Sequence, residues 1–401
     1  MRKREGIIME KTWCIGPIQI VREHQIDLEH YAVIEGKKIV RFCKKSDLPE
    51  QFELVETKAT YKLMPGMIDQ HIHGMSGADV MDGTESSLNT ISKALAKHGV
   101  TSFLATTMTA AVDQIEHALR TIADTGSSVE GAKIAGIHLE GPFINPIQKG
   151  AQSDQHIIKP SAEIFKKLNT SSQKQIKLIT FAAELDEGEK LASYLKNNDI
   201  VASIGHSDAK YAETKILLEQ QLIQNATHFC NGMRPIHHRE PGLQVALLQS
   251  DSKLEIIADG IHIDPDMIRF IFDTIGEDRM ILISDSMRAT ELADGIYDLG
   301  GQQVRVENGL CKLVESDALA GSTLNLNKAR KNMKEWLQLS DLTLAKLTAT
   351  NSAKLLGLYE YKGSIEIGKD ADFYIVNEQE DVVMTVSEGK VIFENLKGEF
   401  E

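Results

Sequence analysis

The sequence has few cysteines, no long apolar run and no basic cluster, and each absence argues against a class of protein. The four cysteines, Cys14, Cys43, Cys230 and Cys311, lie far apart and form no C-x-x-C pair, which favours reduced thiols in a reducing compartment. No apolar stretch approaches the ~20 residues that a helix needs to cross a bilayer, so we expect no membrane role. A formal net charge of -14 without long Lys/Arg runs argues against a nucleic-acid surface, although a local pocket for a small anion is still allowed.

The first residues do not resemble a secretion signal. Met1 to Arg4 are mostly basic, but the apolar stretch 6–9 is too short for the core of a signal peptide, and no small-residue cleavage site follows. We therefore expect a cytoplasmic protein. Its 401 residues are enough for one large barrel-type domain plus a smaller one, or for two or three ordinary domains.

The middle of the chain alternates between short apolar runs and segments of helical periodicity. Leu88, Ile91 and Leu95 show the helical spacing, and Asp264-Pro265 is a typical helix start. Eight such units predict a (β/α)8 TIM-type barrel, with a doubly wound open sheet as the alternative. The strand-like runs are 67–72, 101–106, 133–139, 176–183, 200–205, 225–229, 254–258 and 280–284.

The two ends of the chain have a different pattern. Residues 33–40 alternate around a Gly-Lys turn and predict a hairpin, and the tail contains short alternating runs at 364–367, 373–376, 382–386 and 390–393. We expect both ends to pair into one small β-sandwich domain. The predicted organisation is residues 1–63 and 358–401 in this β domain and residues 64–357 in the barrel.

Histidines and carboxylates recur where the predicted strands end. In a parallel barrel these ends form one face, on which the chemistry takes place. A lone histidine there is usually structural, and a lone aspartate is usually a helix cap, as we expect for Asp208. Independent structural residues would not gather at one face, however, so together they favour a functional site. The residues are His71 and His73, His138 and Glu140, His206, His228, His262, and Asp285.

These residues suit a metal centre. His71 and His73 are two apart and can share one face of a strand, so both can converge on one ion. Glu140, His206 and His228 would complete a site that keeps an open position for water. Imidazole with carboxylate suits zinc, iron or another divalent transition metal better than calcium or magnesium. Asp285 is then placed to move a proton to and from that water.

Eight motifs together resemble the amidohydrolase superfamily, and within it the family of N-acetylglucosamine-6-phosphate deacetylases. The resemblance covers nearly the whole chain, and H-L-E-G-P-F is its most specific part. The motifs are PGMID (65–69), GIHLEGPF (136–143), GHSDA (205–209), TH (227–228), NGM (231–233), REPG (239–242), DGIH (259–262) and SDSM (284–287).

The resemblance implies a set of roles for these residues. Glu140, His206 and His228 would hold the main metal, one or two ions of Zn, Fe, Mn or Co in all, and Asp285 would be the acid/base. A metal-activated hydroxide would attack the acetamide carbonyl, and Asp285 would protonate the departing amine. A homodimer is implied, in which Arg239 reaches the phosphate in the neighbouring site. The other implied substrate contacts are Ala151, Asn231, Gly232, His262, Leu319, Ala320 and Gly321.

The sequence departs from the family pattern at Gln152, and it retains the histidine pair His71 and His73, which varies among members of the family. Many members have histidine where this chain has Gln152, which can donate a hydrogen bond to the substrate carbonyl but cannot be cationic. Some members replace the opening histidine pair and keep one metal. Here His71 and His73 are both present, and Asp285 could then be a ligand as well as a base.

Three alternatives are left open by the sequence. Another amidohydrolase, such as a dihydroorotase-like, adenine-deaminase-like or dipeptidase-like enzyme, would often use a lysine on the fourth strand as a bridge. Here Lys177 lies near the beginning of that strand, and Glu140 is the better bridge. A deacetylase for N-acetylgalactosamine 6-phosphate differs by one epimeric hydroxyl, whose partner the sequence does not reveal. A catalytically silent barrel scaffold is the remote alternative.

Overall fold

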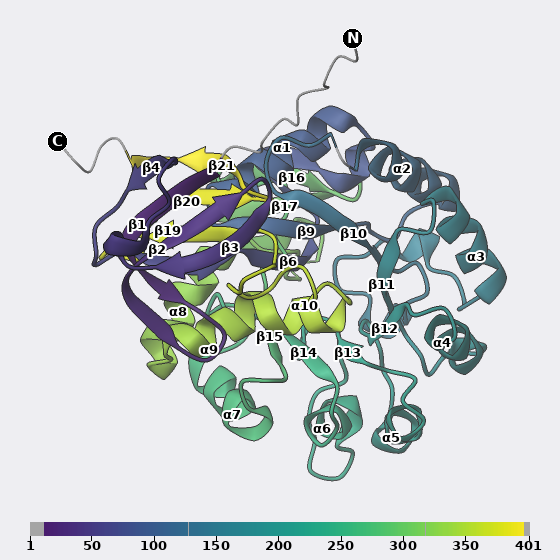
Figure 1. Ribbon diagram of the computed structural model, residues 1–401. Coiled ribbons are helices and arrows are strands. Elements are labelled where there is room, and N and C mark those ends of the chain that lie inside the picture. Colours follow the sequence, from purple (N-terminus) through teal and green to yellow (C-terminus); the bar gives the residue numbers. More distant parts are fainter. Residues whose placement is uncertain (1–11, 127, 317, 397–401) are drawn as a thin grey trace.

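A parallel sheet closed into a barrel occupies the centre of the molecule (Figure 1). The computed structural model describes residues 12–126, 128–316 and 318–396; the N-terminal segment on which we expected no secretion signal lies outside this part. The strands neighbour one another in chain order, and the last contacts the first, where the Asp285 amide donates to the His71 carbonyl at 3.0 Å. They are β6 (Met67–Ile72), β9 (Val100–Thr106), β10 (Lys133–Glu140), β11 (Ile176–Phe181), β12 (Val201–Ile204), β13 (Asn225–Ala226), β14 (Lys253–Ile257) and β15 (Met280–Ile283).

Helices surround this sheet, which confirms the (β/α)8 barrel and excludes the doubly wound alternative (Figure 1). The predicted helix start at Asp264 is confirmed, since its side chain accepts from the Asp266 amide and Pro265 follows. Among the described residues no helix is both long and apolar enough to span a membrane. The helices are α1 (Glu85–Ala96), α2 (Val112–Thr125), α3 (Ala162–Ser171), α4 (Gly188–Lys196), α5 (Tyr211–Glu219), α6 (Gly242–Leu248), α7 (Pro265–Ile275), α8 (Leu326–Leu337), α9 (Asp341–Ala345) and α10 (Asn351–Leu355).

The two ends of the chain form a second sheet beside the barrel, as predicted, with purple and yellow strands side by side (Figure 1). Its order is β21-β20-β19-β5-β1-β2-β3, with β4 beside β1. The sheet curls so that its outer hairpins meet, because the Gly389 amide donates to Ala371 and the Ala371 amide donates to Lys37. The strands are β1 (Thr12–Val21), β2 (Ile26–Glu35), β3 (Lys38–Cys43), β4 (Glu53–Glu56), β5 (Lys62–Pro65), β19 (Phe373–Val376), β20 (Val382–Ser387) and β21 (Lys390–Glu394).

One predicted strand of the tail, 364–367, is wrong. This segment is irregular: Gly363 has a left-handed φ of 83°, and a turn begins at Ile367. Ile365 is nevertheless fully buried in the core of the small sheet. The apolar residue that suggested a strand therefore serves to cover that core. All four cysteines are unpaired in the structure.

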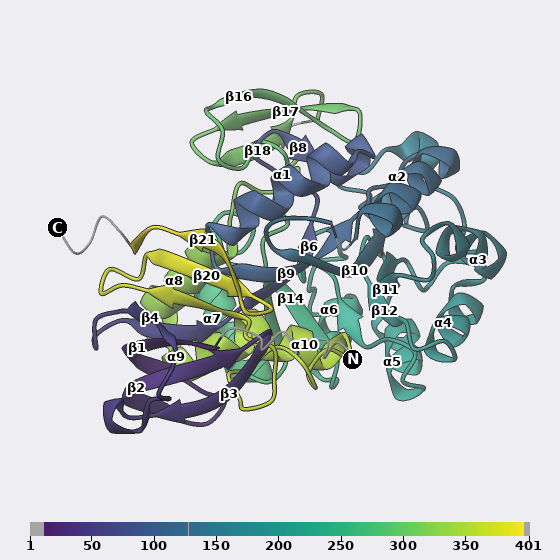
Figure 2. The same ribbon diagram turned by 45° about the horizontal axis from the view of Figure 1, so that its top comes forward.

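A small antiparallel sheet that the sequence analysis did not predict stands over one end of the barrel (Figure 2). It consists of β16 (Gly295–Leu299), β17 (Gln302–Glu307) and β18 (Leu310–Leu313), and a short pair, β7 (Gly74–Met75) and β8 (Ala78–Asp79), lies near it. Leu299 and Val304 pack with Met108 and Met287 of the barrel loops. The Gln302 side chain donates to the Ala151 carbonyl, so this insertion covers the carboxyl ends of the strands.

Candidate active site

The first candidate metal group consists of Glu140, His206 and His228, which follow or end β10, β12 and β13. Glu140 Oε1 lies 3.3 Å from His206 Nε2 and 3.2 Å from His228 Nε2, and the two Nε2 atoms are 3.1 Å apart. Their Nδ1 atoms face the carbonyls of Gln148 at 2.8 Å and Asn231 at 3.1 Å. Since a carbonyl only accepts, each Nδ1 carries the proton. Two lone pairs and a carboxylate therefore converge, an arrangement that fits a cation.

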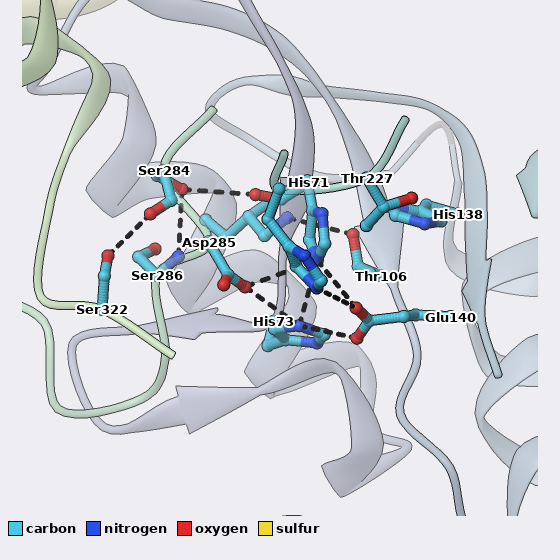
Figure 3. A network of polar contacts seen from close by, with 12 residues as sticks. His71, His73, Thr106, His138, Glu140, Thr227, Ser284, Asp285, Ser286 and Ser322 are labelled. Atoms are coloured by element: carbon cyan, nitrogen blue, oxygen red, sulfur yellow. Dashed lines mark hydrogen bonds and ion pairs between the residues drawn. The ribbon is translucent and has the colours of Figure 1, made fainter. Parts of the chain in front are cut away.

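The second candidate group consists of His71, His73 and Asp285. The two Nε2 atoms are 3.3 Å apart, and Asp285 Oδ1 lies 3.4 Å from that of His71 and 3.3 Å from that of His73. Glu140 also reaches both histidines, at 3.5 Å and 3.2 Å. Asp285 and Glu140 approach the pair from opposite sides (Figure 3). Glu140 thus contacts both groups, as a bridge between two ions would.

All six of these side chains are buried, with exposed fractions of 0% to 7%. Burial opposes the charge of Asp285, but His71 and His73 outweigh it and lower the pKa of this carboxyl to about 2. Burial likewise opposes the charge of His73, yet the hydrogen bonds to Asp285 and Glu140 raise its pKa to about 9. The pKa of Glu140 is held well below its usual value, because His71, His206 and His228 overcome its burial. The carboxylates are therefore held ionised.

Three of the six residues have a strained backbone. The φ angles are 46° for His206, 30° for His228 and 48° for Asp285, in the left-handed region that side chains other than glycine rarely adopt. Such conformations cost about 1 to 3 kcal/mol each and cluster at functional sites. Gly232, with φ of 57°, packs against this arrangement, because an added Cβ would lie 3.0 Å from His206 Nδ1. The strained backbone of these loops therefore lowers the stability of the fold, and it orients the three side chains toward the site.

A cavity of about 280 Å³ opens onto both groups. Twelve of the fifteen predicted site residues line it; His71 and Ala320 lie buried behind it, and Arg239 is outside it. Met108, Gly150, Leu299 and Ala318 also line the cavity and were not predicted. The twelve are His73, Glu140, Ala151, Gln152, His206, His228, Asn231, Gly232, His262, Asp285, Leu319 and Gly321.

The oxygen and the nitrogen of the Gln152 side chain each make a hydrogen bond within the protein. Its Oε1 accepts from the Thr109 amide at 2.8 Å, and its Nε2 donates to Glu140 Oε2 at 2.7 Å. We expected this amide to donate to the substrate carbonyl. In this structure one N–H of this amide fixes the orientation of the carboxylate that both groups share, and the donation to the substrate stays a prediction.

His262 and Arg239 differ in their surroundings. His262 is buried at the cavity wall, and its Nδ1 lies 2.7 Å from Asp259 Oδ2; burial lowers its pKa, but Asp259 outweighs this and raises it. Arg239 is exposed in the loop before α6, where its guanidinium contacts His238. Within one chain the structure does not bring Arg239 to the cavity.

The prediction that Asp208 caps a helix is wrong. Helix α5 begins three residues later, and Lys210 occupies its N-cap position. Asp208 instead accepts from Gln148 at 2.9 Å and pairs with Arg234.

The sequence analysis also missed Glu255, which contacts His71 Nδ1 at 3.1 Å. A carboxylate inside the otherwise apolar run 254–258 was the available signal, because both faces of a barrel strand are buried.

Comparison with known proteins identifies the family. The model of the amidohydrolase family matches residues 63–392. The chain belongs to the amidohydrolase family. It is 40% identical over 393 residues to the N-acetylglucosamine-6-phosphate deacetylase of Bacillus subtilis (strain 168), covering 96% of this chain and 98% of that protein. The family is metal-dependent, which agrees with the two candidate groups.

Two other relatives bear on the substrate. The crystal structure of N-acetylglucosamine-6-phosphate deacetylase from Thermotoga maritima superimposes with a TM-score of 0.85 at 35% identity, covering 95% of this chain and 99% of that one. An N-acetylgalactosamine-6-phosphate deacetylase of Escherichia coli O157:H7 is 33% identical over 311 residues, or 77% of this chain and 82% of the relative. The fold and the family are therefore shared by enzymes that are named for two epimeric substrates.

Proposed function

We propose that this amidohydrolase hydrolyses the acetamide of N-acetyl-D-glucosamine 6-phosphate to D-glucosamine 6-phosphate and acetate. The observation that carries the proposal is the single cavity in which both metal-binding groups and Asp285 face His262 and the main chain of Ala151 and Gly232. The cavity is small, buried and lined by few charged groups besides these, as a site for one sugar phosphate requires. The names of the relatives with the highest identity described above support the same substrate.

The metal-binding groups would hold one or two divalent ions, Zn, Fe, Mn or Co. Glu140, His206 and His228 form one group, and His71, His73 and Asp285 form the other, with Glu140 between them. A divalent ion held there would act as a Lewis acid toward the amide carbonyl and toward water. The residues fit this role, because the Nε2 atoms of four histidines converge on Glu140 and none of the described ion pairs gives this carboxylate a lysine or arginine partner.

Asp285 is the residue that would move the proton. Its carboxylate is ionised and lines the cavity, so it can accept a proton from water and donate it to the departing amine. The strand end holds it in place, because its amide donates to the His71 carbonyl at 3.0 Å and its carbonyl accepts from the Ser322 amide at 2.8 Å. Gln152 would keep Glu140 oriented while this happens.

The remaining predicted residues would bind the sugar phosphate. Asp259 accepts a hydrogen bond from His262 Nδ1–H, which favours the cationic form of the ring that a phosphate prefers. Ala151, Asn231 and Gly232 would offer main-chain groups to the sugar, and the segment 319–321 would cover it. The insertion β16–β18 would close the cavity through Leu299.

We further propose a cytoplasmic homodimer in which Arg239 reaches the phosphate of the partner's substrate. Its exposure on the loop before α6 supports a contact outside its own chain. Mixing Arg239→Ala subunits with Asp285→Asn subunits tests this. Hybrid dimers would regain one working site, since the first subunit supplies Asp285 and the second supplies Arg239. Activity no higher than the sum of the two separate variants would refute the exchange.

The proposed reaction is tested by acetate release from Zn²⁺-loaded protein with three substrates: N-acetylglucosamine, its 6-phosphate and N-acetylgalactosamine 6-phosphate. We expect turnover of the gluco sugar phosphate and its loss on metal removal. Equal turnover of the unphosphorylated sugar would refute the phosphate role. Faster turnover of the galacto epimer would replace the proposed substrate with the second candidate, which the E. coli relative supports.

A further inference from the structure

Glu255 is a fully buried carboxylate on β14, directly beneath the candidate metal groups. It accepts four hydrogen bonds. Oε1 accepts from Gln70 Nε2 at 2.7 Å and Asn225 Nδ2 at 3.0 Å, while Oε2 accepts from the His228 amide at 3.2 Å and faces His71 Nδ1 at 3.1 Å. It lies outside the cavity and touches no reacting group, so the proposed mechanism gives it no role.

A chain of buried hydrogen bonds fixes the direction of these contacts. His138 Nδ1 faces the Gln70 carbonyl at 3.2 Å and must donate, so its Nε2 accepts from Thr180 Oγ1 at 2.7 Å. Thr180 then accepts from Thr227, Thr227 from Ser203, and Ser203 from Asn225 Nδ2, at 2.6, 2.5 and 2.9 Å. The Asn225 amide therefore turns its NH₂ toward Glu255. Glu255 meets only donors and is held as an anion.

His71 stands between Glu255 on one side and Glu140 and Asp285 on the other. Glu140 and Asp285 lie 3.5 Å and 3.4 Å from Nε2, and either could draw the ring proton to that nitrogen. A proton on Nε2 would remove the lone pair that a metal needs. Glu255 competes for this proton at Nδ1, with its other acceptor positions already satisfied.

We propose that Glu255 is a positioning residue that keeps His71 in the Nδ1–H form and thereby enables the second group to bind an ion. The inference rests on the proposed metal dependence. The first group does not need such a partner, because main-chain carbonyls already fix His206 and His228. Occupancy of the second group then depends on a charge buried in the barrel interior.

Glu255→Gln tests this, since it keeps the shape but presents an amide donor to His71. We expect Zn²⁺ titration to give two ions per chain in the parent. Affinity for one of them should fall about 10- to 100-fold in the variant, while the other is retained. Glu116→Gln, a buried carboxylate that pairs with Lys167 outside the site, is the matched control and should keep both ions. In a His71→Asn background Glu255 has no histidine to orient, so Glu255→Gln should cause no further loss of Zn²⁺ affinity. Unchanged affinities, or one ion in the parent, would overturn the proposal.

A second measurement uses the parent protein and does not depend on the variant folding. ¹⁵N chemical shifts of the ring nitrogens of Zn²⁺-loaded protein should show His71 protonated at Nδ1 only. A proton on Nε2 would overturn the proposal. Neither readout needs substrate, so absence of acetate release would refute the proposed function and leave these results standing.

Discussion

The barrel mouth and the junction between the barrel and the small sheet each contain a cluster of charged side chains, and the carboxylates of the two clusters have different partners. At the barrel mouth the ion-pair partners of the carboxylates are histidines, and none of the described ion pairs joins Glu140, Asp285 or Glu255 to lysine or arginine. The second cluster, which we call the α8 cluster, joins the barrel to the small sheet and consists of Lys62, Arg330, Lys334, Asp341 and Glu380.

In the α8 cluster every charge has a partner of opposite sign. Arg330 is fully buried, and its three nitrogens donate to Asn327 at 3.1 Å and to the Glu380 carboxylate and carbonyl at 2.5 Å and 3.1 Å. Lys62 and Lys334 complete the pairs. Buried charges cost free energy unless they are paired. Carboxylates whose partners are histidines can exchange protons and bind metals, whereas carboxylates paired with lysine and arginine are typical of a structural cluster. Changes at the barrel mouth should therefore reduce activity and metal binding, whereas changes in the α8 cluster should reduce stability and leave metal binding intact.

The largest expected effect is on the barrel mouth. Asp285→Asn should lower the rate of acetate release by about 10²- to 10⁴-fold, the range for loss of a general acid/base. Because His71 and His73 lower the pKa of Asp285 to about 2, the ionised carboxylate also stabilises the metal-free fold, so the melting temperature of metal-free protein should fall as well. Acetate release and thermal unfolding measure the two effects. Full activity in the variant would refute the assigned role.

A substitution in the α8 cluster should lower stability without lowering metal binding. Arg330→Met should reduce the free energy of unfolding by about 3 to 5 kcal/mol, because it leaves buried acceptors without a donor. Metal content per folded chain should be unchanged. Urea unfolding measures the stability, and Arg305→Met, at an exposed arginine of β17, is the control with an expected loss within about 0.5 kcal/mol. A similar loss in both variants would contradict the comparison.

An intermediate effect on Zn²⁺ affinity is expected when the hydrogen bond from Gln152 to Glu140 is removed. Gln152→Ala removes the hydrogen bond to Glu140 Oε2 and should weaken Zn²⁺ binding about 10- to 100-fold, as changes behind a metal ligand do. Isothermal titration with Zn²⁺ measures the affinity. Gln155→Ala, on the exposed part of the same loop, should bind normally. Equal affinities in the two variants would mean that Glu140 needs no support.

The smallest effect concerns acid stability of the α8 cluster. Burial raises the pKa of Glu380, but Arg330, Lys334 and Lys62 outweigh it and lower the pKa to about 2. The stabilisation is therefore present above the ordinary pKa of glutamate and is lost as the pH falls toward 2. Because solvent partly screens this group, we expect about 1 to 2 kcal/mol. The stability difference between the parent and Glu380→Gln should shrink between pH 5 and about 3; a constant difference would contradict the assignment.

Much of the fold was predictable because it depends on local patterns. All eight barrel strands were found within a few residues, since each is a short apolar run between helical segments. The insertion β16–β18 was not, because its strands are half exposed and carry alternating polar residues such as Gln303 and Arg305. Asp208 was assigned to a helix cap from its position alone, whereas its contacts with Gln148 and Arg234 depend on loops far apart in the chain.

The sequence by itself determined the barrel, the family and the residue types that meet at the strand ends, because periodicity and motifs are local properties. Only the tertiary structure decided how those residues are held. It showed that Gln152 is bound to Glu140, that Arg239 lies outside the cavity of its own chain, and that Glu255 contacts His71. The physical reason is that hydrogen-bond direction and charge balance arise between side chains far apart in the chain, 184 positions for His71 and Glu255, which no local pattern records.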